Sequence, residues 1–333
     1  MAKIVRFDTI GGPENLKIVE EEPADPGAGE VLVDVKAAGL NRAEYLYMAG
    51  QYLVQPNLPS RIGVEGAGVI MAVGAGVENY KVGDEVSITP NMSPAEYGVL
   101  GEVAIVPVAA LAPKPATISF EHAAALWMAY PTAYGGLVEV GGLKQDAGQV
   151  VVISAASSSV GLPAIQIAKS HGATVVATSR GTSKKEAIMA VGADHLIATG
   201  EEDFAARVME ITDGRGFDIA FDPVAGPFLE ALVNGAAVEA TIVEYGALSM
   251  SETAFPLFPV IGKGVRVFGF HLLYNLFQHP DRTSRALANL GAGFENGTYV
   301  PVIDRVFPLA EVADAYQHMA GNQQIGKIIV SGE

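Results

Sequence analysis

The chain has 333 residues, 50% of them hydrophobic, and carries 37 acidic against 21 basic side chains and no cysteine. This length favours two domains, each with enough apolar side chains for a core. The formal charge of −16 disfavours nucleic acid and anionic membranes as partners, and the absence of cysteine excludes disulfides, thiolate nucleophiles and thiolate metal sites. Residues 1–8 contain charged side chains where a signal peptide would have its apolar region, so we expect a cytoplasmic protein.

The first third of the chain has the pattern of a β-rich domain. Residues 30–37 alternate loosely between apolar and polar side chains, as a half-buried strand does. Between residues 63 and 83, glycines separate short valine-bearing runs, which indicates a compact, barrel-like β domain. At Ser119 the pattern changes, because a serine followed by Glu121 predicts the start of a helix that continues to residue 128.

From residue 148 onward, strands alternate with helices. Strands are predicted at 150–153, 174–178, 195–197 and 218–221, and helices at 162–170, 184–191 and 203–212. Later strands are predicted at 265–270, 302–307 and 327–330, and later helices at 282–290 and 309–319. Buried strands that alternate with helices predict a parallel, doubly wound sheet, and therefore an α/β fold.

A turn of small residues follows the first of these buried strands. The candidate contacts to a cofactor pyrophosphate in this turn are Ala156, Ser158, Ser159, Val160 and Gly161. Small side chains between a strand and a helix let the backbone approach a pyrophosphate, whose charge then faces the helix N-terminus. The turn lacks the Gly-x-Gly-x-x-Gly pattern, so an ordinary tight turn is the alternative interpretation.

The end of the second strand predicts which nicotinamide cofactor is bound. An NAD site usually has an acidic residue about 20 residues past the glycine turn, where it holds the ribose hydroxyls. Here the place is taken by Ser179, Arg180 and Lys184, and no carboxylate appears before Glu186. Cations and hydroxyls suit the additional phosphate of NADP. The alternative is a solvated basic turn, although cations are poorly placed at a helix start.

Short motifs spread over nearly the whole chain carry a family resemblance. They lie at residues 39–44, 50–52, 63–68, 73–77, 82–86, 166–169, 172–173, 192–194, 222–226 and 326–328. Together they resemble the medium-chain dehydrogenase/reductase superfamily, in its zinc-independent quinone oxidoreductase branch. The family's phosphate turn has two middle glycines, which are Ser158 and Ser159 here.

The resemblance implies a domain organisation and an assembly. A GroES-like, β-rich catalytic domain begins at residues 1–125, and a Rossmann NADP-binding domain follows at 126–262. Residues 263–333 then return to complete the catalytic domain and the edge of the Rossmann sheet. A homodimer paired through the Rossmann sheets near residues 265–270 is also implied.

The resemblance further assigns site residues. Asn41 is expected to donate an amide hydrogen bond to the substrate, and Tyr52 a hydroxyl hydrogen bond and a proton, while Thr132 lies near the nicotinamide. Asn322 and Lys327 are assigned to the same phosphate as Arg180 and Lys184. Tyr245, Gly246 and Phe270 are the remaining candidate cofactor contacts, and they are expected to line the pocket, where aromatic side chains select flat substrates. Each assignment has a structural alternative. In these alternatives Asn41 is a turn residue whose side chain bonds its own backbone, Tyr52 is a half-buried loop aromatic, and Thr132 is a hydroxyl at a helix start. Tyr245 and Phe270 are then ordinary residues of the hydrophobic core.

The resemblance also bears on the reaction. Zinc-dependent relatives place a histidine where Val64 stands here, and they use cysteines as ligands, so we expect no metal. A quinone or α,β-unsaturated carbonyl spreads the charge of an incoming hydride, so hydrogen-bond donors replace the Lewis acid. The expected function is therefore NADPH-dependent reduction of a small quinone or conjugated carbonyl. An enoyl-thioester reductase and an NADPH-binding protein with little turnover are the alternatives.

Overall fold

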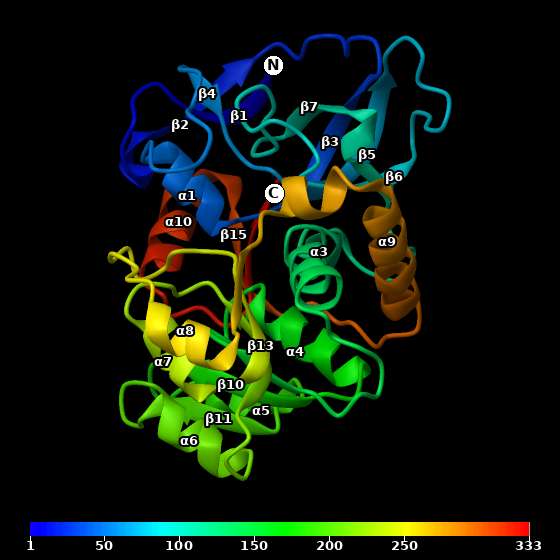
Figure 1. The fold of residues 1–333 in the computed structure, drawn as a ribbon. Helices are drawn as coiled ribbons and strands as arrows, with labels where there is room; N and C mark the ends of the chain where they lie inside the picture. The colour runs from blue at the N-terminus through cyan, green and yellow to red at the C-terminus, as the bar shows by residue number, and fades with distance from the viewer. Residues whose placement is uncertain (333) are drawn as a thin grey trace. The chain divides into compact units, whose positions relative to one another are not determined.

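The computed structural model, which describes residues 1–332, contains two units (Figure 1). Unit 1 comprises residues 1–128 and the chain from Pro301 onward, and unit 2 comprises Ala129–Val300. The sequence analysis grouped residues 263–300 with residues 301–333. In the structure they lie in unit 2, because their strand β14 (Arg266–Gly269) joins the parallel sheet of that unit.

Unit 1 is built from two sheets. The smaller sheet has the order β2-β1-β4, from β1 (Ala2–Phe7), β2 (Leu16–Glu21) and β4 (Ser60–Arg61). The larger has the order β15-β16-β3-β5-β6-β8, with β7 also paired to β3. Its strands are β3 (Glu30–Gly39), β5 (Gly66–Val73), β6 (Glu85–Ile88), β7 (Val103–Pro107), β8 (Leu111–Pro113), β15 (Ile303–Pro308) and β16 (Lys327–Ser331). Because β16 pairs antiparallel with β3, the two ends of the chain share one sheet.

Short helices join these strands. They are α1 (Arg42–Met48), α2 (Phe120–Ala123) and α10 (Val312–Ala320), with single turns η1 (Pro13–Asn15), η2 (Val108–Ala110) and η5 (Leu309–Glu311). Ser119 caps α2 as predicted, since its side chain accepts a hydrogen bond from the backbone N–H of His122. The helix ends at Ala123, short of the predicted residue 128. The following Ala124 and Ala125 are buried against β3 and β5, so tertiary packing overrides helix propensity there.

Unit 2 is a six-stranded parallel sheet with the order β11-β10-β9-β12-β13-β14. The strands are β9 (Val150–Ile153), β10 (Thr174–Ser179), β11 (His195–Ala198), β12 (Phe217–Asp222), β13 (Ala236–Glu244) and β14 (Arg266–Gly269). The predicted doubly wound α/β fold is confirmed. Only β13 was not predicted, because the charged Glu239 interrupts its apolar run.

Helices cover both faces of this sheet. Helices α6 (Phe204–Ile211) and α7 (Phe228–Gly235) share one hydrophobic core with five strands, β9 to β13, and α8 (Leu257–Lys263) packs on β13. Right-handed crossovers place α4 (Gly161–Ser170) and α5 (Lys185–Ala190) on the opposite face. Unit 2 also contains α3 (Ala129–Tyr134), the π-helical turns η3 (Gly135–Val140) and η4 (Leu273–Phe277), and α9 (Pro280–Glu295).

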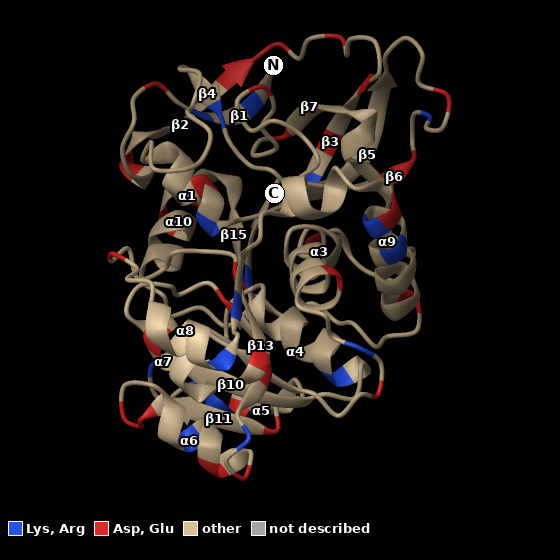
Figure 2. Cartoon of the chain, in the orientation of Figure 1, with Lys and Arg blue, Asp and Glu red and all other residues tan. Residues whose placement is uncertain are grey.

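Acidic side chains are distributed over both units (Figure 2), in keeping with the formal charge of −16. In the described part of the chain, residues 1–332, no helix combines the length and apolar character needed to cross a bilayer.

Candidate functional site

The carboxyl edge of the parallel sheet gathers most of the predicted cofactor residues. Parallel strands end at one edge, so the segments after β9, β10, β13 and β14 all begin there. The chain leaves β9 toward β10 on one side and returns to β12 on the other, which makes the β9–β12 boundary the topological switch point. Open sheets of this type bind dinucleotides at that crevice.

The turn after β9 is folded tightly against the start of α4. The buried Ala156 N–H donates to the carbonyl of Thr178 at 3.0 Å, and the Gly161 N–H donates to Ser158 Oγ at 3.0 Å. A Cβ on Gly161 would lie 2.6 Å from the Ala156 carbonyl oxygen, so this position requires glycine. Ser159 and Val160 are half-buried at the tip of the turn. The geometry brings backbone groups and a helix N-terminus together, as a pyrophosphate site needs.

The turn between β10 and α5 presents basic side chains. Ser179 Oγ donates to the Gly181 carbonyl, which fixes the turn. Arg180 is exposed, and its guanidinium has no hydrogen bond or ion pair within residues 1–332. Lys184 is the N-cap residue of α5. A Cβ on Gly181 would lie 3.4 Å from Glu201 Oε1, so one carboxylate approaches this turn from the segment after β11.

Aromatic residues at the ends of β13 and β14 are packed into unit 2. The Tyr245 ring stacks on Phe221 with 4.0 Å between centroids, and burial raises the pKa of the Tyr245 phenol. Gly246 lies against Pro223, because a Cβ there would be 3.0 Å from the Pro223 carbonyl oxygen. Phe270 is 6% exposed and contacts Gly135, where an added Cβ would lie 2.7 Å from the Phe270 Cζ. Much of this aromatic surface is therefore core.

Two acidic residues at the same edge were missed by the sequence analysis. Asp222 ends β12, Glu244 ends β13, and the two are paired in the strand register. Asp222 accepts hydrogen bonds from Ser154 Oγ and, at 2.7 Å, from the Ala225 N–H. Burial and the neighbouring Asp222 raise the pKa of Glu244 to about 9. Recognising β13 in the sequence would have aligned the two carboxyls.

Thr132 lies in the interior of α3 and is 7% exposed, so it is not a helix-start hydroxyl. Helix α3 packs against α4, the helix that follows the phosphate turn.

In unit 1, Asn41 belongs to a buried network of charges. Its Nδ2 donates to the Gly39 carbonyl at 3.1 Å and to Glu65 Oε1 at 3.0 Å, and its Oδ1 accepts from Lys327 Nζ at 2.7 Å. Lys327 also forms an ion pair with Glu65, and both side chains are no more than 2% exposed. The structure therefore gives Lys327 an internal partner in place of the cofactor phosphate expected from the sequence.

Glu44 completes this network. It occupies position N3 of a capping box whose N-cap is Asn41, and it accepts from the Asn41 backbone N–H at 2.9 Å. It also accepts from the Tyr316 hydroxyl at 2.7 Å and from the Val64 backbone N–H at 3.0 Å. Burial raises the pKa of Glu44, and the hydrogen bonds from Tyr316 and Asn41 oppose the shift. The Asn41-x-x-Glu44 spacing is the signal that could have predicted this contact.

Two further predicted residues lie in unit 1. Tyr52 is half-buried and packs against the core of the unit. Asn322 adopts a positive φ of 55°, and its Oδ1 accepts from an Arg42 guanidinium nitrogen at 2.7 Å.

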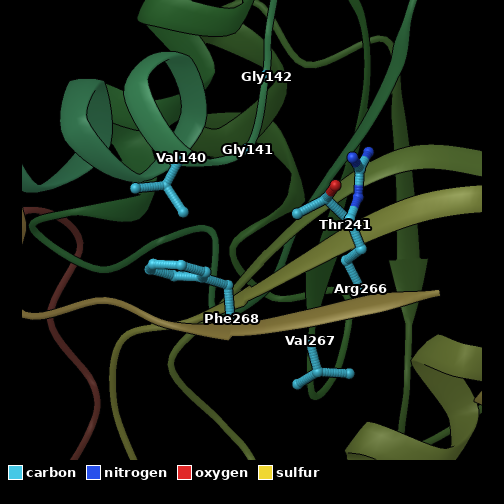
Figure 3. A pocket seen from close by; sticks show the side chains of 7 residues that line it. All are labelled: Val140, Gly141, Gly142, Thr241, Arg266, Val267 and Phe268. Carbon is cyan, nitrogen blue, oxygen red and sulfur yellow. The ribbon is translucent and has the colours of Figure 1, made fainter.

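A pocket of about 390 Å³ lies beside the edge strand β14 (Figure 3). Val140, Thr241, Arg266 and Phe268 contribute to its lining, and Figure 3 shows their side chains around it. None of its lining residues is a predicted cofactor contact.

Sequence signatures of two domains match the chain. The signature described as "Alcohol dehydrogenase GroES-like domain" matches residues 27–116, and "Zinc-binding dehydrogenase" matches residues 159–290. The quinone oxidoreductase of Pseudomonas aeruginosa is 31% identical over 330 residues, which cover 99% of this chain and 99% of the relative. The synaptic vesicle membrane protein VAT-1 homolog of Rattus norvegicus is 32% identical over 339 residues, covering 96% of this chain and 82% of the relative.

Solved structures resemble the chain over nearly its whole length. A quinone oxidoreductase of Pseudomonas syringae has a TM-score of 0.90 at 32% identity, covering 99% of this chain and 100% of that chain. An NAD-dependent alcohol dehydrogenase (TM-score 0.88, 30% identity) and a mycobacterial protein complexed with NADPH (0.89, 26%) have the same coverage. CurK enoyl reductase has a TM-score of 0.88 at 27% identity and covers 99% of each chain.

Proposed function

Since the chain belongs to the medium-chain dehydrogenase/reductase family, in its quinone oxidoreductase branch, we propose that it reduces a quinone or α,β-unsaturated carbonyl with NADPH and without a metal. The observation that carries the proposal is the end-to-end similarity to the Pseudomonas aeruginosa quinone oxidoreductase. The family is an oxidoreductase family that binds a nicotinamide cofactor.

The donor set in unit 1 does not fit the zinc ion after which one matching signature is named. The position after Gly63 holds Val64, whose backbone N–H is bound by Glu44, and the chain has no cysteine. Among residues 1–332, no three His, Asp or Glu side chains gather as a metal-binding group. The proposed reaction therefore uses no bound cation.

Binding of NADPH is supported by the turn after β9 and by the basic turn after β10. Bound NADPH would supply the hydride. The start of α4 would face the pyrophosphate, and Arg180 with Lys184 would hold the additional phosphate through charge-assisted hydrogen bonds.

Asn41 has a positioning role in this proposal. Its amide hydrogens are directed at Gly39, Glu44 and Glu65, so it orients the start of α1. Tyr52, which follows α1, is then the hydroxyl that we assign to the carbonyl oxygen of the substrate, as a hydrogen-bond donor and source of the proton that accompanies the hydride.

We also propose that the protein is a homodimer paired at β14. The outer side of β14 is an open sheet edge, and the adjacent α8 exposes Phe258 (84%) and Ile261 (66%). Light scattering after gel filtration is expected to give twice the mass of one chain, and a monomer at micromolar concentration would contradict the pairing.

The function is tested by following NADPH oxidation with a panel of acceptors. Quinones and simple enones are expected to be reduced, with NADPH preferred over NADH. The likeness to CurK enoyl reductase favours a second candidate, an enoyl-thioester reductase, which would reduce crotonyl-coenzyme A best. Tight NADPH binding with no turnover on any acceptor would contradict both and leave a cofactor-binding protein.

Replacing Tyr52 with phenylalanine is expected to lower kcat for enone reduction by about 100-fold, the lower range for a positioned general acid. The Kd for NADPH should not change. Tyr45→Phe is the matched control, because Tyr45 is a half-buried tyrosine of the preceding helix α1. Stopped-flow measurement of NADPH oxidation gives the rate, and an unchanged kcat would remove Tyr52 from the reaction.

A further inference from the structure

The carboxyl pair at the ends of β12 and β13 has no place in the function proposed so far. We infer that Asp222 and Glu244 share one proton, and that this proton holds the Tyr245–Gly246 turn in the form that binds the nicotinamide half of the cofactor. The cofactor part of this inference rests on the proposed function.

Asp222 has the surroundings of a carboxylate. It is fully buried at the end of β12, a central strand of the sheet. Its Oδ1 accepts from Ser154 Oγ, and its Oδ2 accepts from the Ala225 N–H at 2.7 Å. Donors at both oxygens stabilise the charged form.

Glu244 has the surroundings of a carboxylic acid. Both of its side-chain oxygens are buried, and no N–H or O–H donor from residues 1–332 reaches them. The charged group that acts on Glu244 is the carboxyl of Asp222, its partner in the strand register. Two carboxyls can hydrogen-bond only when one carries a proton, and two adjacent buried charges repel strongly. In the inferred pair, Glu244 holds the proton because no other donor reaches its oxygens, and Asp222 is the acceptor.

Charges on neighbouring elements do not neutralise this pair. The other titratable or charged groups on β13 and on the elements that pack against it or adjoin it are Glu239 of β13, Asp218 of β12, Tyr245, Glu139 of η3, Glu230 of α7, Lys263 of α8, Arg266 of β14 and His271 after β14. Asp218 is paired with Arg215 at 2.6 Å. Lys263 donates to the carbonyls of Val233, Asn234 and Ala236 at the opposite end of β13. Glu139 is paired with Arg285 at 2.6 Å. Desolvation and Asp222 are what raise the pKa of Glu244 to about 9.

The position of the pair links it to the nicotinamide half. Strands β12 and β13 lie on one side of β9, whereas β10, which carries the basic turn for the adenosine phosphate, lies on the other. A dinucleotide that crosses the switch point therefore places its nicotinamide half over β12 and β13. Tyr245 follows Glu244 directly, and its ring stacks on Phe221, the neighbour of Asp222. A negative charge on Glu244 in addition to that on Asp222 would stand next in sequence to both stacked rings, Tyr245 and Phe221.

The test is the pH dependence of NADPH binding in the variant Glu244→Gln. Glutamine keeps the shape and donates to Asp222 through its amide, but it cannot ionise. Wild-type Kd for NADPH is expected to rise about fourfold between pH 7 and 9.5, as the protonated fraction falls. The Glu244→Gln variant should change by less than about twofold. Glu239→Gln, an exposed site on the same strand, should behave as the wild type.

A second measurement needs no cofactor. The pKa of Glu244 is higher in the folded than in the unfolded chain, so the folded state holds one more proton at intermediate pH. Wild-type stability is therefore lost as pH rises from about 5 toward 9, and the advantage of Glu244→Gln in urea unfolding should grow over that window and then level off.

The possible results separate the two claims. A stability difference that does not vary with pH would overturn the shared proton. An equal pH dependence of NADPH binding in wild type and Glu244→Gln would overturn its role at the cofactor. Failure of the wild type to bind NADPH at any pH would remove the proposed function and the cofactor part of this inference, while the unfolding data would still decide on the proton.

Discussion

The variant Lys327→Met is expected to lose about 3–5 kcal/mol of unfolding free energy, because it leaves Glu65 as a buried charge without its cation. Lys327 and Glu65 are almost completely buried, and Asn41 bonds to both. Urea unfolding at pH 7, analysed by linear extrapolation, measures the loss.

Two controls make this result specific. The double variant Lys327→Met with Glu65→Gln is expected to recover part of the loss, because the Glu65 charge that lost its cation is then removed as well. Lys81→Met removes an exposed lysine that is 82% accessible and paired with Asp84, and it should leave stability unchanged within error. A Lys327→Met variant as stable as the wild type would contradict the buried ion pair.

The second large effect is expected at the basic turn after β10. The double variant Arg180→Ser and Lys184→Ser should weaken NADPH binding by about 100-fold or more, since each charge-assisted hydrogen bond contributes about 1.5–3 kcal/mol. Binding of NADH should persist, because the carboxylate of Glu201 approaches this turn and suits ribose hydroxyls. Cofactor fluorescence titration gives both Kd values.

Lys185→Ser is the matched control for this experiment, because Lys185 is an exposed lysine in the next position of the chain. Its removal should change NADPH binding little. Equal losses for NADPH and NADH in the double variant, or a wild type that prefers NADH, would refute the assignment of Arg180 and Lys184 to the additional phosphate.

The sequence predicted the doubly wound sheet well because its strands carry uninterrupted apolar runs. Residues 150–153 and 174–178 are such runs, and β9 and β10 occupy nearly the same positions. The run in β13 is broken by Glu239, so its register with β12 could not be read from the chain. The Asp222–Glu244 pair depends on that register and was therefore missed.

The network in unit 1 was missed for a different reason. It joins Asn41, Glu44 and Glu65 to Tyr316 and Lys327, which lie more than 200 residues further along the chain. No local pattern predicts pairing over that separation. Asn41 was predicted as a substrate contact, and its hydrogen bonds became visible only once β16 was placed beside β3.

The central claim is that hydride transfer in this protein needs a conjugated acceptor and no bound cation. The most direct measurement is NADPH oxidation by protein dialysed against a chelator and assayed for metal content, with a quinone, an enone and a saturated ketone as acceptors. We predict undiminished turnover of the quinone or the enone and none of the saturated ketone. Loss of turnover on chelation with recovery on adding zinc, or equal kcat/KM for the saturated ketone, would contradict the claim.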